Sequence, residues 1–278
     1  MTVAVFCAVL FAAALHAAWN AIVKGGSDKF LSTVLITVAA SLAAVVLLPF
    51  LPSPAPASWP YLLVSGCLQV TYFALVARTY HLADMSLTYP VMRGSAPLLV
   101  ALVSNVWLGE RLTAGAWLGI AIICLGILSM TVGSRHSNAG KGVSLALLNA
   151  VVIAGYTLID GLGVRLSGTP AAYILWVYLL TGLPLVIWTL ARRPAALATY
   201  ASQHWQLGFI GGIGSLVSYG IALWAMTVAP IAIIAALRET AILFGTVISY
   251  LVLKERVTRA RLAAACAILA GAIALRLA

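Results

Sequence analysis

The stretch LGERLT at residues 108–113 returns as LKERVT at residues 253–258, which is 145 positions further along the chain. At the same offset, without gaps, Arg93 aligns with Arg238. Only 8% of the residues are charged, so a shared Glu-Arg-x-Thr element together with an aligned arginine is not a chance product of composition. The pattern predicts an internal duplication.

The composition places this duplication in a membrane. Of the 278 residues, 63% are hydrophobic and 8% are charged. Globular chains carry roughly 25% charged residues. A membrane-spanning helix needs about 20 mostly apolar residues. Ten continuous runs satisfy this requirement, and because they do not alternate they favour helices over a β-barrel. The predicted spans are 3–23, 31–51, 60–80, 85–108, 113–132, 142–162, 171–190, 205–227, 229–253 and 260–277.

Each repeat therefore contains five helices, the first at residues 1–138 and the second at residues 139–278. Because five is odd, the second repeat must enter the membrane inverted relative to the first. Inverted repeats are typical of transporters, with the substrate near the midplane between the halves. The predicted fold is an all-α membrane protein whose two inverted repeats surround a central cavity.

The basic residues predict the orientation. If the loops alternate between sides, eleven of the 16 Lys and Arg fall on one side and three on the other, with Arg93 and Arg238 inside spans. The first side receives Lys24, Lys29, Arg78, Arg135, Lys141, Arg192, Arg193, Lys254, Arg256, Arg259 and Arg261, and the second Arg111, Arg165 and Arg276. The positive-inside rule places the first side in the cytoplasm and both termini outside. We expect a multi-pass protein of the cell inner membrane, either a monomer or a homodimer.

Other classes of function lack support in the sequence. The net charge of +10 follows from the loop residues, and no basic stripe with aromatic platforms indicates nucleic-acid binding. The four cysteines, Cys7, Cys67, Cys124 and Cys266, are far apart and form no metal-binding motif. Neither HExxH, GxSxG nor a P-loop is present, so we expect no enzyme, no metal and no cofactor.

With ten helices, two repeats and a Gly/Lys-Glu-Arg element ending the fourth helix of each, the chain resembles the EamA branch of the drug/metabolite transporter superfamily over its whole length. Leu15–Asn20 (LHAAWN) resembles one subgroup of that branch. The resemblance implies a bundle with a central cavity that alternates access and exports amino acids or other small metabolites. It does not specify the substrate.

Three charged residues lie deep in predicted spans, where each costs about 2.5–3.5 kcal/mol on insertion scales. Arg93 and Arg238 enter from opposite faces and could meet at one cavity, where a guanidinium group binds carboxylate or phosphate. The alternative is structural pairing to helix carbonyls or to Glu239. Glu239 is a candidate for proton coupling, because burial favours the neutral acid, or for a salt bridge.

Polar and aromatic side chains complete the candidate site. His16, Trp19 and Asn20 share one face of the first span, which suggests substrate contacts and, for His16, proton coupling. Further wall candidates are Tyr72, Tyr89, Tyr156, Tyr219 and Trp224. Packing or interfacial roles are the alternative for each aromatic residue.

Prolines and terminal charges yield three more expectations. Pro90 and Pro97 predict a break or kink beside Arg93, and the matching positions in the second repeat, Ala235 and Ile242, carry no proline. Glu110 and Glu255 are interpreted as caps or gate contacts. Asp160 and Arg165 are expected near a helix end, where they could pair.

The pattern as a whole favours a secondary transporter of a small zwitterionic or anionic metabolite, coupled to protons or uncoupled. The alternative is a multidrug-type exporter of lipophilic cations. Such relatives place a Glu in the first helix, where this chain has His16, and buried arginines would repel a cation. A membrane-embedded enzyme and a channel are the remaining, less favoured, hypotheses.

Overall fold

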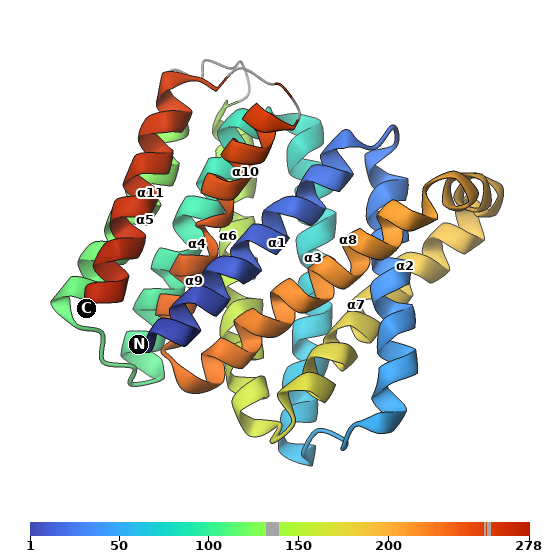
Figure 1. Ribbon diagram of the computed structural model, residues 1–278, viewed down its shortest axis with the longest axis horizontal. Helices are drawn as coiled ribbons and strands as arrows, with labels where there is room; N and C mark the ends of the chain where they lie inside the picture. Colours follow the sequence, from blue (N-terminus) through green and yellow to red (C-terminus); the bar gives the residue numbers. More distant parts are fainter. Residues whose placement is uncertain (132–138, 253, 255–256) are drawn as a thin grey trace.

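A computed structural model of the chain describes residues 1–131, 139–252, 254 and 257–278. Arg135, Glu255 and Arg256 lie outside the described residues. The described part contains ten segments that are long and apolar enough to cross a membrane (Figure 1). The helices are α1 (Val3–Gly25), α2 (Lys29–Leu47), α3 (Trp59–Leu82), α4 (Met85–Trp107), α5 (Ala114–Leu128), α6 (Ala139–Leu166), α7 (Pro170–Arg192), α8 (Pro194–Val228), α9 (Ile231–Arg238), α10 (Ala241–Leu251) and α11 (Arg259–Leu277).

Most spans agree with the predicted ones within a few residues, but the eighth does not. The sequence predicts a polar interruption from Arg192 to His204, whereas α8 begins at Pro194 and continues to Val228. Proline is well suited to the first helical position, and the alanine-rich residues that follow are strong helix formers. A helix of 35 residues rises about 53 Å, more than the roughly 30 Å hydrocarbon layer. Its first turns therefore extend beyond the span that the sequence predicts.

The two repeats are interwoven rather than separate. The 145-residue offset matches α1 with α6, α2 with α7, α3 with α8, α4 with α9 and α10, and α5 with α11. The contacts obey this equivalence: α1 packs on α8 and α10, just as α6 packs on α3 and α4, while α5 pairs with α11 and α2 with α7. In Figure 1, α5 and α11 lie at one end of the long axis and α2 and α7 toward the other. Neither repeat can bury its apolar faces alone.

Glycines show this symmetry at atomic detail in the α5–α11 pair. A Cβ added to Gly126 would lie 3.5 Å from the carbonyl oxygen of Ala264, and one added to Gly271 would lie 2.8 Å from that of Gly119. These two contacts are equivalent under the 145-residue offset. Small residues at such positions let helix backbones approach closely.

The break predicted beside Arg93 is wrong, whereas the alternative of a kink there stays a prediction. The fourth span is one continuous helix despite Pro90 and Pro97. The break occurs instead in the ninth span, between Arg238 and Ala241, where the backbone is wound more tightly. There the N–H groups of Glu239 and Thr240 donate to carbonyls three residues back, and the Thr240 hydroxyl donates to the Leu237 carbonyl at 2.6 Å. A threonine hydroxyl that donates to a backbone carbonyl of its own helix tightens the helix locally. In a sequence, a threonine is a weaker indication of a helix break than a proline.

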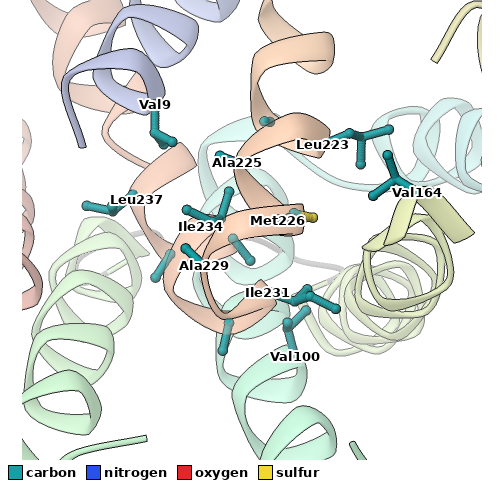
Figure 2. Close-up of a cluster of buried hydrophobic side chains, with 14 of the residues drawn as sticks. Val9, Val100, Val164, Leu223, Ala225, Met226, Ala229, Ile231, Ile234 and Leu237 are labelled. Carbon is teal, nitrogen blue, oxygen red and sulfur yellow. The ribbon is translucent and has the colours of Figure 1, made fainter. Parts of the chain in front are cut away.

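The main core surrounds α9. Ile231, Ile234 and Leu237 of α9 are fully buried and meet side chains from α1, α4, α6 and α8 (Figure 2). The outer surface, by contrast, exposes large apolar residues such as Phe11, Leu42 and Trp107. An apolar exterior is what a lipid environment requires.

Candidate functional site

A small cavity lies between α4, α6 and α9 and is lined by both arginines of the predicted site. It is lined by Arg93, Ala96, Pro97, Val100, Ile153, Tyr156, Thr157, Ala235, Arg238 and Glu239. Its volume of about 10 Å³ holds roughly one water molecule. The inverted repeats thus bring Arg93 and Arg238 to one place, in a conformation too closed to hold a metabolite.

Arg93 is paired with Glu239. Its Nε donates to Glu239 Oε2 at 2.9 Å, and both residues are buried, at 9% and 4% exposure. The pair joins α4 of the first repeat to the break after α9 in the second. Its geometry is that of the structural alternative for these two residues, and the positive charge of Arg93 is balanced within the protein.

Arg238 has a different environment. Its guanidinium carbon lies 4.9 Å from the centre of the Tyr219 ring, a cation–π contact. The residue is half-buried and lines the cavity. Within the described part of the chain its guanidinium group makes no hydrogen bond or ion pair. Its fork of donors is therefore available to a ligand in the cavity.

Three of the predicted tyrosines gather close to these charges. Tyr156 lines the cavity, and Tyr72 meets it edge to face at 5.9 Å between ring centres. Tyr72 and Tyr89 pack against the same buried cluster as Tyr156. Electrostatic interactions link both to Arg93 and Glu239. These rings form an aromatic wall on the side of α3, α4 and α6.

The predicted polar face of α1 is only partly present. His16 and Trp19 meet edge to face at 5.1 Å, and the charges of Arg93 and Arg238 both act on His16. The indole nitrogen of Trp19 is buried and has no hydrogen-bond partner among the described residues. Asn20 is exposed, and its amide donates to the carbonyl of His16 at 2.7 Å, so the structure does not bring it to the cavity.

Trp224 is also placed away from the site. It is 42% exposed on the outside of α8. Tyr219, five residues earlier on the same helix, faces inward instead. Five residues correspond to about 500° of helical rotation, so the two side chains leave the helix on different faces.

Asp160 is a buried carboxylate that the sequence does not predict, and the expected pairing with Arg165 is wrong. Asp160 is fully buried and accepts hydrogen bonds from Gln69, Tyr173 and Tyr219. The sixth predicted span ends at residue 162, whereas α6 continues to Leu166 and carries Asp160 into the protein. The available signal was its spacing of four residues from Tyr156, which places both on one helix face.

Arg165 contributes instead to a polar clasp that joins the end of α6 to Glu110, to the end of α8 and to the start of α9. Its Nη2 donates to Glu110 at 2.7 Å and to the Ala229 carbonyl at 3.0 Å, and its Nε donates to the Met226 carbonyl at 2.7 Å. The Glu110 carboxylate also accepts the N–H of Ile231, at the first turn of α9. Glu110 thus caps a helix of the opposite repeat. The buried cluster around α9 includes Val164, the residue before Arg165, and Leu237, the residue before Arg238 (Figure 2).

The profile of the EamA-like transporter family matches residues 3–132 and again residues 140–277. A solved structure described only as "Crystal structure of protein" has a TM-score of 0.76 and 17% identity, covering 98% of this chain and 95% of its own, which supports the fold alone. No curated protein matches. The family profile matches once in each repeat, which agrees with the ten helices and with a site of buried charge between the halves. Members of this family are multi-pass membrane transporters of small molecules rather than enzymes. The chain belongs to the EamA-like transporter family.

Proposed function

We propose that this protein is a secondary transporter of a small zwitterionic or anionic metabolite, such as an amino acid. In this proposal it acts as an exporter in the cell inner membrane and works by alternating access. The repeat boundaries at residues 138 and 139 and the choice between monomer and homodimer stay predictions.

The observation that carries the proposal is the contrast between the two arginines. Arg93 is neutralised by Glu239 at 2.9 Å, whereas Arg238 rests on the Tyr219 ring and faces the cavity. A guanidinium group cannot lose its charge in a protein and binds carboxylate or phosphate through two parallel hydrogen bonds. Arg238 is therefore assigned as the anion anchor, with Arg93 and Glu239 holding the floor of the cavity.

The surrounding residues take secondary roles. Tyr156 and Tyr72 supply the wall against which the rest of the substrate would pack, and Tyr89 supports that wall. His16 of α1 interacts electrostatically with both arginines, and the unpartnered indole nitrogen of Trp19 beside it offers one donor to an acceptor atom. Asn20 and Trp224 would reach a substrate only after a conformational change, because both are exposed in this state.

The closed cavity supports alternating access. About 10 Å³ does not admit an amino acid, so the helices must move apart for loading. The clasp of Glu110, Arg165 and the first turn of α9 shuts the end that the positive-inside rule places outside. The buried apolar cluster around α9 blocks the same route.

Export of lipophilic cations is less well supported. Such a substrate needs an unneutralised carboxylate in the cavity. Glu239 is the carboxylate that lines it, and Glu239 is already bound to Arg93. The half-exposed charge next to it is Arg238, which would repel a cation.

Thermal denaturation of the purified protein with amino acids, phosphonates, sugar phosphates and quaternary amines tests the proposal. A ligand at 100 times its Kd stabilises the folded state by about 2.7 kcal/mol, so binding raises Tm. We expect anionic or zwitterionic ligands to do so, and Arg238→Ala to weaken their binding roughly 10–150-fold, the value of a hydrogen bond to a charged group.

Arg111→Ala removes an exposed arginine on the same chain and is the matched control, which should bind like wild type. Unchanged affinity in Arg238→Ala would remove this residue from the site. Stabilisation by quaternary amines alone would favour the cation exporter instead. Transport assays in proteoliposomes of known orientation, with and without an imposed proton gradient, decide direction and coupling.

A further inference from the structure

We propose that Asp160 is a proton-binding site of this transporter, linked through Tyr219 to anion binding at Arg238. The linkage rests on the proposed role of Arg238, whereas the proton site itself does not.

Asp160 sits in a closed shell of neutral groups. Its Oδ1 accepts from the Tyr173 hydroxyl at 3.1 Å, and its Oδ2 accepts from the Gln69 amide at 3.3 Å and from the Tyr219 hydroxyl. These donors come from α3, α7 and α8, and Ser65 of α3 contributes as well. No cationic nitrogen of a described residue lies within ion-pair distance. Burying a lone charge is costly, so a carboxylate in such a place needs a distant counter-charge or a proton.

The shell can satisfy both the ionised and the protonated form. A tyrosine or serine hydroxyl can donate to a carboxylate or accept from a carboxylic acid. When Asp160 gains a proton, one of Tyr219 and Tyr173 can therefore accept its O–H while the other continues to donate to the second oxygen. Glu239 lacks this freedom, because the guanidinium of Arg93 can only donate. Of the two buried carboxylates, Asp160 is the one built for reversible protonation.

Tyr219 connects this carboxylate to the cavity. Its hydroxyl binds Asp160, while its ring face carries Arg238 at 4.9 Å. The charge of Arg238 acts on Asp160, and Tyr173 and Tyr219 are the titratable groups in contact with it. Tyr61 of α3 lies beyond Tyr173.

Charge balance then defines the coupling. Among the described residues, the charged side chains at the cavity and its tyrosine-linked neighbour are two positive ones, Arg93 and Arg238, and two negative ones, Glu239 and Asp160. An anion bound at Arg238 leaves one excess negative charge in a medium that disfavours it. A proton from water on the open side converts the Asp160 carboxylate to a carboxylic acid and restores neutrality. A zwitterion adds no net charge and requires no proton, so the two ligand classes differ in proton uptake.

Infrared difference spectroscopy of the protein in lipid bilayers, recorded as pH is lowered, tests the proton site without any ligand. We expect a carboxylic-acid C=O band that is present in wild type and in Glu239→Gln and absent in Asp160→Asn. Labelling all aspartates with ¹³C at the carboxyl provides a second assignment that needs no mutation. The label should shift the frequency of the band, and Tyr219→Phe should also perturb it. The other two aspartates, Asp28 and Asp84, lie at helix N-termini, away from Tyr219 in the chain, so this variant tests Asp160. A band that survives in Asp160→Asn, or that ignores the aspartate label, overturns the proposal.

Lactate and alanine form a matched pair of probes for the coupling, because they differ by a hydroxyl in place of an ammonium group. In weakly buffered solution, lactate binding should take up about one proton per protein and alanine binding none, and Asp160→Asn should take up none with either. Lactate binding without proton uptake refutes the coupling. This result is separable from failure of the anion anchor, which shows as undiminished binding in Arg238→Ala.

Discussion

The Arg93–Glu239 pair predicts a strongly non-additive response to mutation. At 2.9 Å and an effective dielectric constant of about 20, the gross attraction is about 6 kcal/mol. Most of that offsets the desolvation of two buried charges, so the net contribution to stability is small. Removing one partner alone costs about 3–5 kcal/mol, because it leaves an uncompensated buried charge.

The two single variants should differ. Glu239→Leu strands a guanidinium that cannot lose its proton, whereas Arg93→Met strands a carboxyl that can gain one. We expect Glu239→Leu to lower Tm by roughly 6–15 °C and Arg93→Met to lower it less. The double variant should return to within about 1 kcal/mol of wild type, as replacement of a buried pair by apolar residues often does.

Thermal unfolding of the four proteins in one detergent, read by tryptophan fluorescence, completes the double-mutant cycle. Glu239→Gln is the control, because it retains a hydrogen-bond acceptor for Arg93 Nε and removes only the charge. Additive losses in the double variant would show that the two side chains do not stabilise each other, and would refute the pairing.

Three further predictions follow from packing, closure and topology. In chemical denaturation, Gly212→Ala should lower the free energy of unfolding by about 1–3 kcal/mol, because its Cβ would lie 2.7 Å from the Ile36 carbonyl oxygen. A Cβ at Gly214 would meet nothing within 4 Å, so Gly214→Ala should leave the free energy of unfolding unchanged or raise it by up to about 1 kcal/mol. Glu110→Gln should weaken the clasp by about 1.5–3 kcal/mol and so speed thiol labelling of Ala235→Cys from the Glu110 side roughly 10–150-fold. Arg111→Gln is the control. Unchanged labelling in Glu110→Gln would exclude the clasp as a barrier. In a background without the four native cysteines, Arg111→Cys and Lys254→Cys should react with impermeant reagents from opposite faces, and labelling from the same face would contradict the inverted repeat.

The sequence predicts the parts of this protein that depend on long patterns. Ten apolar runs and one repeated motif suffice for the helices and the inversion, and the aligned arginines mark the centre. Contacts between distant helices are not encoded in such patterns, so the partner of Arg93 and the donors to Asp160 required the structure. The position of the break escaped prediction because the prolines of α4 are a stronger local signal than Thr240, although in lipid a helix can tolerate proline when neighbouring groups satisfy its freed carbonyls.

The clasp at Glu110 has a consequence for which way the protein faces at rest. If the two halves were identical, exchanging their conformations would reproduce the same molecule turned over, and both orientations would have equal energy. Arg165 breaks this degeneracy, because the residue 145 positions earlier is Asn20, whose amide reaches only its own helix at 2.7 Å. On one face, the charged side chain of Arg165 thus donates to three acceptors. At the matching place on the opposite face, the side chain of Asn20 is shorter and uncharged. We expect this difference between Arg165 and Asn20 to favour closure of the Glu110 face in the unloaded protein.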